Sequence, residues 1–344
     1  MNTSIHRRDA LKLAVGTAAL GAGLGHFGSA TAAQSISCIN FGFVLGIHCP
    51  PTRGLVEECP RFGLNVELHR FQKARDILQT IIGGRGDVAV SEPITALRSV
   101  QAGSDLTIFG NYYLHTSLVV VVNADQIQTF EDFTKSDVTI GINSQGDITQ
   151  VMMIGGMLKT GADPSKVNWA DVGGSGSRMR ALISKRIQAS VIHFDQVPNV
   201  QKSGNYKILL VPSNEYDPWV NEVVYARTEW LAKPENRASA VNFMKGIITA
   251  HRSATRDYGY YKKAFLDYAT VKGKDKMPDT ELKAYWQMLA KDMDVWPANN
   301  GFKTSNFEKL MPYYIAAKAV EDSPLDLGKV IDESIVAQAL KELG

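Results

Sequence analysis

The sequence predicts an α/β protein with two lobes, a hinge of two chain crossings and a helical C-terminal extension. A strand–loop–helix–strand unit at residues 64–91 recurs later in the chain at 168–196. The pattern restarts near Asn123, and an apolar strand at 222–226 is expected to return from the second half to the first. At 344 residues the chain is also long enough for two domains.

The first unit is indicated by its alternating and then helically spaced apolar residues. These predict a strand over 64–68 and an amphipathic helix over 74–82. Gly83–Gly86 ends that helix, and a buried strand over 87–90 leads to Ser91. Ser91 therefore stands at the carboxyl end of a strand, where open α/β sheets bind their ligands.

The second unit has the same layout around a loop of glycines and serines. Gly173–Ser177 precedes a helix expected over 178–186, whose apolar residues share one face. The next strand contains Val191–Ile192 and ends at His193–Gln196. We expect the two halves to face each other across a cleft that strand ends and helix N-termini line.

The remaining elements follow from apolar alternation, continuous apolar runs and turn residues. Strands are expected over 35–44, 107–111, 118–122, 138–142, 208–211 and 222–226, and helices from Thr52 and over 148–158, 235–254, 279–293 and 334–343. We assign 36–122 and 222–344 to the first lobe and 123–221 to the second.

Residues 1–33 have the features of an export signal. The twin arginines Arg7 and Arg8 precede an uncharged stretch, and small residues near Ala32 suit cleavage by signal peptidase. The segment is similar to a twin-arginine (Tat) signal; a Sec signal or an unstructured N-terminus are the alternatives. We expect a periplasmic protein without a transmembrane helix, because no later apolar stretch is long enough to span a bilayer.

The charge and the cysteine content limit the possible partners and disulfide bonds. A net charge of +2 without a run of basic residues argues against a nucleic-acid partner. Cys38, Cys49 and Cys59 are an odd number, so at least one thiol is unpaired. Cys49 and Cys59 could form a disulfide across the first helix, or all three could be buried thiols.

Several short motifs, in a fixed order, give the chain a family resemblance. They are the twin-arginine signal, Gly-x-Gly-Asp-Val-Ala-Val (84–90), Ala-Gly-Ser-Asp-Leu (102–106), Gly-x-x-Ser-x-Gly-Asp-x-Thr (141–149), Gly-Gly-Ser-Gly (173–176) and Trp-Leu-Ala-Lys-Pro-Glu (230–235). Together they resemble periplasmic solute-binding proteins of ABC importers, in the group that binds nitrate, sulfonates, taurine and thiamine-pyrimidine precursors. The resemblance covers nearly all of residues 36–260 and implies the two-lobed type II periplasmic binding fold.

The resemblance implies a monomer that carries a small molecule to an ABC permease in the inner membrane. The aromatic content favours an organic anion, such as a sulfonate or a carboxylate, over nitrate. The family usually has Gly-x-Val/Ile-Asp-Ala before a strand of the second half, whereas this chain has Arg186–Ala189. The alternatives are a binding protein for thiamine-pyrimidine precursors, a related synthase-like enzyme, and a periplasmic sensor module.

The candidate ligand-binding residues lie in the two helix-start loops, at strand ends and in the hinge. Backbone N–H groups at helix N-termini favour an anionic group, glycines let a ligand approach the backbone, and aromatic rings can cover an organic ligand. The candidates are Phe43, Ser91, Tyr112, Tyr113, Ser144, Gly146, Thr149, Gly174, Ser175, Ser177, Phe194, Asp195 and Trp219. N-capping, tight turns and core packing are the structural alternatives for these residue types.

The sequence carries no pattern of catalytic or metal-binding residues. His48 and His193 fall near the expected cleft, but no metal-ligand spacing accompanies them. Arg75 and Arg178 begin helices and could grip an acidic group, although solvated charges on a helix face are the more common case. We therefore expect a binding protein without a cofactor and without enzymatic activity.

Overall fold

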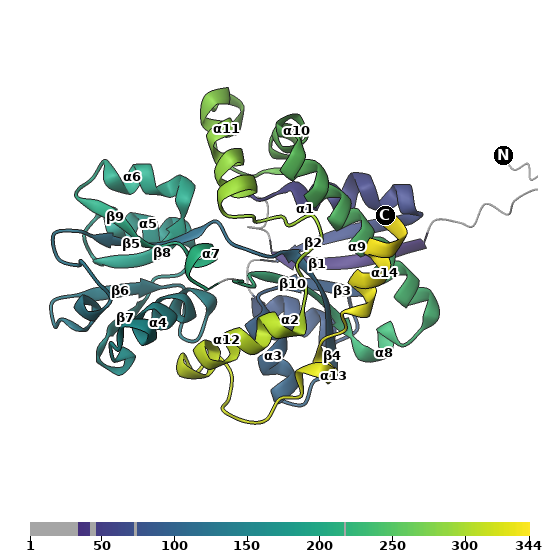
Figure 1. Ribbon diagram of the computed structural model, residues 1–344, viewed down its shortest axis with the longest axis horizontal. Coiled ribbons are helices and arrows are strands. Elements are labelled where there is room, and N and C mark those ends of the chain that lie inside the picture. Colours follow the sequence, from purple (N-terminus) through teal and green to yellow (C-terminus); the bar gives the residue numbers. More distant parts are fainter. Residues whose placement is uncertain (1–33, 42–45, 72–73, 217) are drawn as a thin grey trace, which may run out of the picture. The chain divides into compact units, whose positions relative to one another are not determined.

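The computed structural model describes residues 34–41, 46–71, 74–216 and 218–344, which contain two five-stranded mixed sheets (Figure 1). The first has the order β2-β1-β3-β10-β4 and the second the order β7-β6-β8-β5-β9. The strands of the first are β1 (Gln34–Phe41), β2 (Leu64–Phe71), β3 (Val88–Ser91), β4 (Leu106–Tyr113) and β10 (Glu222–Arg227). Those of the second are β5 (Leu118–Asn123), β6 (Thr139–Ile142), β7 (Asn168–Asp171), β8 (Ala189–His193) and β9 (Tyr206–Leu210).

The two sheets have matching topology. In each, three strands are parallel, and the next strand in the order, β10 or β5, runs antiparallel between two neighbours. The parallel connections step first to one side and then to the other, so right-handed crossovers place successive helices on opposite faces of the sheet. Figure 1 shows this arrangement, with α4 and α5 on either side of the second sheet.

Fourteen α-helices lie in the described part of the chain. They are α1 (Pro50–Arg53), α2 (Ala74–Ile82), α3 (Pro93–Gln101), α4 (Ile148–Thr160), α5 (Ser175–Ile183), α6 (Val197–Gln201), α7 (Pro212–Glu215), α8 (Thr228–Leu231), α9 (Pro234–Arg256), α10 (Tyr258–Tyr268), α11 (Asp279–Gln287), α12 (Thr304–Ala316), α13 (Leu327–Val330) and α14 (Ser334–Leu343). The helix expected from Thr52 begins at Pro50 and continues as a π-helical and then a 3₁₀ segment to Phe62. Gly63, with φ of 75°, ends it in the left-handed conformation that glycine adopts readily.

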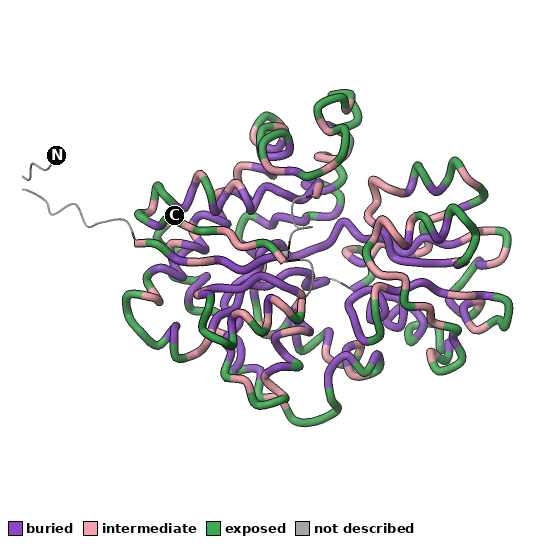
Figure 2. The backbone as a smooth tube through the Cα atoms, turned by 180° about the vertical axis from the view of Figure 1, so that it is seen from behind, coloured by how far each residue is buried: buried purple, intermediate pink, exposed green. Residues whose placement is uncertain are grey.

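The core follows the strands of both sheets. All eight residues of β4 are buried, and so are the first five of β5 and of β10, as expected of continuous apolar runs covered on both faces. Figure 2 shows the buried residues along these strands and the exposed ones on the outer turns of helices and loops. Cys38, Cys49 and Cys59 are buried free thiols, so the alternative without a disulfide is the one observed.

Two chain crossings join the sheets, and they lie side by side. One is residues 114–117, between β4 and β5, and the other precedes β10. The backbone N–H of Asn221 donates to the carbonyl of Leu114 at 2.8 Å. The strand at 118–122, which the sequence assigned to the first lobe, pairs with β8 and β9 of the second sheet. The first crossing therefore lies before Leu118 rather than near Asn123.

The C-terminal region is helical, as expected. It contacts a strand of the first sheet and a helix that packs on the second sheet. Asn300 exchanges three hydrogen bonds of 2.8–3.0 Å with Asn111 on β4. On the side of the second sheet, α12 packs against α4. The ring of Tyr313 lies 5.3 Å from that of Tyr216, measured between centroids. The C-terminal extension is therefore hydrogen-bonded to β4 of the first sheet and packed against α4 of the second.

Candidate functional site

The strand ends of both sheets bring polar side chains to one place. Glu92 follows β3, Tyr113 ends β4, and Glu222 begins the antiparallel β10, so all three lie at the same edge of the first sheet. In the second sheet His193 ends β8, and Ser117 precedes the β5 strand that pairs with it. Ligands of open α/β sheets bind at these edges.

His48 connects the two edges. It lies in the loop between β1 and α1 and is 2% exposed. Its ring centroid is 4.8 Å from that of Tyr113 in the first sheet and 5.5 Å from that of His193 in the second. Ser117 Oγ in turn lies 2.7 Å from His193 Nδ1. We name the seven residues that gather here the inter-sheet cluster: His48, Glu92, Tyr113, Asp147, Arg178, His193 and Glu222.

The histidines of the cluster are neutral at pH 7. Burial lowers the pKa of His48 to about 4. Burial, followed by the charges of His48 and Arg178, lowers the pKa of His193 well below its usual value. Neither ring nitrogen of His48 has a hydrogen-bond partner within the described residues. Such a group is expensive to leave unpaired, so it marks a place where a donor or acceptor is missing.

Carboxyl groups of the cluster hold their protons more tightly than usual. Burial and then the charge of Asp147 raise the pKa of Glu92 to about 8. Burial and then Glu92 raise the pKa of Glu222 well above its usual value. Glu222 is 2% exposed, and its Oε2 has no partner among the residues described. The cluster is thus a low-dielectric region with closely spaced acids.

The start of α4 carries its own acidic groups. Asp147 caps the helix, since its Oδ1 accepts hydrogen bonds from the Gln150 backbone N–H at 3.2 Å and from Thr149 Oγ1 at 2.6 Å. Thr149 Oγ1 also accepts from the N–H of Asn143 at 3.0 Å. From the other sheet, the pKa of Glu92 is raised by burial and by Asp147, while the backbone N–H of Ile148 acts to lower it. Protein groups therefore occupy donors at this helix start.

The start of α5 is held by side chains of the second sheet's own lobe. The helix begins at Ser175, three residues before the expected start at Arg178. Ser175 Oγ donates to Gln196 Oε1 at 2.6 Å and accepts from the His193 N–H at 3.3 Å. Arg178 is 3% exposed rather than solvated, and it donates to the carbonyls of Val191 and Gly173. Its charge faces Asp147 and Glu92. Arg75, by contrast, is exposed.

The structure brings some predicted site residues close to the cluster. Ser91 Oγ pairs with Tyr225 Oη at 3.0 Å beside Glu92, and Tyr113 belongs to the cluster itself. Thr149 and Ser175 hold its helix starts in the way just described. Gly146 is buried with φ of 72°, and a Cβ built there would lie 2.8 Å from Arg98 Nη2 of the other half. The positive φ favours glycine at this position.

Other predicted residues lie away from the cluster or on the surface. Tyr112 is buried in the first lobe, where its Oη is 2.9 Å from Thr52 Oγ1, because successive strand residues point to opposite faces. Trp219 packs 5.0 Å from Tyr216. Ser144 and Gly174 are exposed, and Ser177 accepts from Arg180.

Two further predicted residues follow His193, and one falls outside the described part. The Phe194 ring meets that of Tyr285 of α11 edge-on at 5.5 Å. Asp195 is partly buried, and its pKa is raised to about 6, first by burial. Phe43 lies outside the described residues.

Sequence reasoning missed Glu92, Asp147 and Glu222 as members of a site. Glu92 and Asp147 immediately follow or precede predicted elements, so a rule that collects every polar residue at a strand end or helix start would find them. Glu222 begins a strand expected to run back into the sheet. Only the antiparallel pairing of β10 with β3 and β4 places it at the ligand-binding edge.

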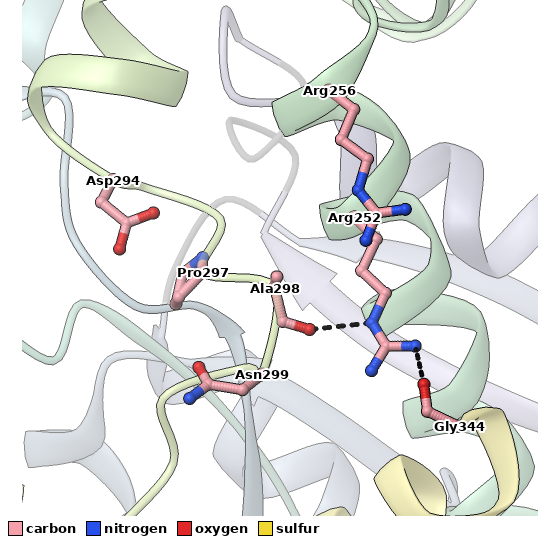
Figure 3. Close-up of a pocket in the computed structure, with 7 residues that line it drawn as sticks. All are labelled: Arg252, Arg256, Asp294, Pro297, Ala298, Asn299 and Gly344. Atoms are coloured by element: carbon pink, nitrogen blue, oxygen red, sulfur yellow. Dashed lines mark hydrogen bonds between the residues drawn. The ribbon is translucent and has the colours of Figure 1, made fainter.

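A surface pocket of about 480 Å³ lies elsewhere, between the end of α9 and the segment that precedes α12 (Figure 3). Arg252 in its wall donates to the Ala298 carbonyl at 3.0 Å and to that of Gly344 at 3.3 Å. Its guanidinium is therefore engaged by the backbone, and this pocket shares no residue with the inter-sheet cluster. Among the described residues, no group of three His, Cys, Asp or Glu is placed to hold a metal ion.

Comparison with known proteins adds a family model and similar folds. The model described as "NMT1/THI5 like" matches residues 61–257. No curated protein matches the chain significantly. The part of the chain that the structure describes has no helix long and apolar enough to cross a membrane.

Three solved structures illustrate the likeness of fold. The ligand-binding component of an ABC-type import system from Staphylococcus aureus has a TM-score of 0.67 and 14% identity, with 89% of this chain and 99% of that chain covered. The periplasmic nitrate-binding protein from Synechocystis PCC 6803 has a TM-score of 0.70 and 10% identity, with 90% of this chain and 89% of that chain covered. The alkanesulfonate-binding protein from Xanthomonas axonopodis pv. citri, bound to MOPS, has a TM-score of 0.62 and 14% identity, with 89% of this chain and 97% of that chain covered.

Proposed function

Because the chain belongs to the NMT1/THI5-like family, we propose that it captures a small organic solute between two lobes and delivers it to an ABC importer. It has the two-lobed fold of periplasmic binding proteins. In this proposal one lobe is built around the first sheet and the C-terminal helices, and the other around the second sheet. The mature protein acts in the periplasm as a monomer, and its role is binding rather than catalysis.

One observation carries the proposal: buried polar atoms without partners gather where the two sheets' edges meet. His48, Asn221 and Glu222 are each at most 5% exposed. Both ring nitrogens of His48, Asn221 Oδ1 and Glu222 Oε2 have no hydrogen-bond partner within the described ranges. Native proteins satisfy nearly all such atoms, so a bound molecule is a natural source of the missing partners.

Hinge closure supplies the mechanism. Two adjacent crossings allow the lobes to open and close, and a solute favours the closed form only if it contacts both lobes. His48 and Glu222 present groups from the first lobe, and His193 presents one from the second. An importer could then distinguish the loaded, closed form from the open one.

A thermal-shift screen of the mature protein tests this function. Carboxylates, sulfonates, amines and heterocycles would be compared, because a compound that binds only the native form raises the melting temperature. The proposal expects at least one class to produce a saturable, one-to-one shift. Saturable binding that persists unchanged in both His48→Ala and His193→Ala would place the solute elsewhere.

The solved structures of a nitrate-binding and an alkanesulfonate-binding protein suggest an anion as the solute, and an organic anion is what the sequence favours. The carboxyl groups and unpartnered oxygens of the inter-sheet cluster favour a different class of solute.

A further inference from the structure

We propose that the solute held at the inter-sheet cluster is a small organic cation whose N–H groups face Glu92 and Glu222. This inference rests on the proposed function and specifies its substrate class. Four features of the cluster lead to it: its charge balance, the state of the α4 N-terminus, the kind of atoms left unpartnered, and the aromatic ring beside them.

The cluster holds more carboxyl groups than cations. Three carboxyl groups, those of Glu92, Asp147 and Glu222, lie near two arginines, Arg178 and Arg98, and the two histidines are neutral. Arg98 donates to the carbonyls of Ala319 and Lys318. Arg178 already donates to the carbonyls of Val191 and Gly173 and faces Asp147. An incoming sulfonate or carboxylate would therefore meet several acids and no uncommitted guanidinium.

The helix start that would attract an anion is already served by the protein. Asp147 Oδ1 accepts from the Gln150 N–H and from Thr149 Oγ1. This acid thus lies at the positive end of the α4 dipole. An anion at this place would therefore find fewer free N–H donors than at an open helix start.

Two of the unpartnered atoms are oxygens that a donor would satisfy. Glu222 Oε2 and Asn221 Oδ1 lack a partner within the described ranges, and an amide oxygen or an ionised carboxylate only accepts. The neutral His48 ring adds one acceptor nitrogen and one N–H donor. A protonated amine or amidinium supplies several N–H donors and a charge that compensates the carboxylates. Tyr113, whose ring lies 4.8 Å from His48, offers an aromatic face to such a cation.

The raised pKa values of the two glutamates fit this proposal. Without a cation, burial keeps the pKa of Glu92 at about 8 and that of Glu222 well above its usual range. A bound cation would favour the ionised carboxylates, so binding would release protons and strengthen as pH rises toward 8. The other titratable groups near these acids are Asp147, Arg98, Arg178, Tyr112, Tyr113, Tyr225 and Tyr314.

Pairs of probes with the same size and opposite charge test the inference. Benzamidine is compared with benzoate, and n-butylammonium with n-butanesulfonate, by thermal shift and calorimetric titration of the mature protein. We expect at least one cation to bind and its paired anion to bind at least tenfold more weakly. Calorimetry in buffers of different ionisation enthalpy is expected to show proton release on cation binding at pH 7.

Two variants and a control locate the effect. Glu222→Gln and Glu92→Gln each remove one charge with little change of shape, and each is expected to weaken cation binding at least tenfold. Glu308→Gln, at an exposed position of α12, is the matched control and should bind as the unmodified protein does. The melting temperature of each unliganded variant shows whether it is folded.

Each other outcome overturns the inference. Binding of an anion without its paired cation would leave the proposed function standing and reject the cation. Cation binding that is unchanged in both glutamine variants would place the cation outside this cluster. Absence of binding by both cations would also contradict the inference, whereas the screen described above would continue to test the function.

Discussion

Glu92 illustrates how one partly buried carboxyl couples the site to stability. Its pKa is raised to about 8 in the folded chain, first by burial and then by Asp147. The unfolded chain ionises it near the usual value of 4.5. Its contribution is therefore fully present below pH 4.5 and is lost as pH rises through 8. Glu222 acts in the same direction.

Buried histidines affect the free energy of unfolding in the opposite direction, and over a lower range of pH. Burial lowers the pKa of His48 and of His251 to about 4, so acid favours the unfolded chain between pH 6.5 and 4. Above pH 6.5 these histidines are neutral in both states. The range from pH 6.5 to 8 therefore isolates the carboxyl contribution.

We predict that the free energy of unfolding falls as pH rises from 6.5 to 8 and that Glu92→Gln reduces this fall by about 1 kcal/mol. Urea denaturation at several pH values measures it. Glu308→Gln, which changes an exposed glutamate, should keep the slope of the unmodified protein. An equal slope in Glu92→Gln would show that Glu92 does not titrate in this range.

At the scale of elements, the C-terminal extension depends on a small buried anchor. Asn300 Oδ1 accepts the Asn111 backbone N–H at 3.0 Å, and Asn300 Nδ2 donates to the Asn111 carbonyl at 2.8 Å. Nearby, the Leu114 N–H donates to the Val295 carbonyl at 3.1 Å. The extension is thus hydrogen-bonded to the crossing as well as to β4.

We predict that Asn300→Gly lowers the free energy of unfolding by about 2–4 kcal/mol, because it leaves two buried backbone groups of Asn111 unpaired. Asn300 has φ of 66°, so glycine keeps the backbone conformation while removing the side chain. Chemical denaturation provides the measurement. Asn299→Gly, at the exposed neighbouring position, is the control and should change stability much less.

If Asn300→Gly is as stable as the control, the side-chain bonds do not anchor the extension. Asn300→Ala adds a further test, because its Cβ must occupy the left-handed region. It should be less stable than Asn300→Gly by about 1 kcal/mol.

Most elements could be predicted from the sequence because their apolar periodicity is strong. The helices at 74–82 and 334–343 have the expected bounds, and the strands at 64–68, 118–122 and 222–226 form within a few residues of expectation. Which sheet each strand joins was harder to predict from the sequence. The continuous apolar run at 118–122 indicates a buried strand, yet periodicity does not say which sheet it joins.

The sequence predicts where the candidate cluster lies better than it predicts which residues form it. Its position at strand ends follows from the repeated unit, and Tyr113, Thr149 and Ser175 take part in it or support it. Side-chain direction decided the failures: Tyr112 and Tyr113 are adjacent on β4 and face opposite ways. The expected anion preference rested on exposed helix-start donors, and the pairing of Asp147 and Glu92 with them depends on three-dimensional packing.

Across the whole molecule, the proposed function requires two lobes that close over a solute. Both crossings lie together at Leu114 and Asn221, and the inter-sheet cluster is the place where the lobes' polar groups meet. Without a solute, unpartnered groups such as His48 and Glu222 favour exposure to water. With a solute, the same groups favour the closed form.

The distance between the lobes in solution is the measurement that tests this claim most directly. Spin labels on cysteines introduced at exposed Arg61 and Lys202 would report it by double electron–electron resonance, because the three native thiols are buried. The account predicts a long, broad distance distribution without solute and a shorter, narrower one with the compound that gives the largest thermal shift. Identical distributions with and without that compound at saturation would contradict capture by closure of the two lobes.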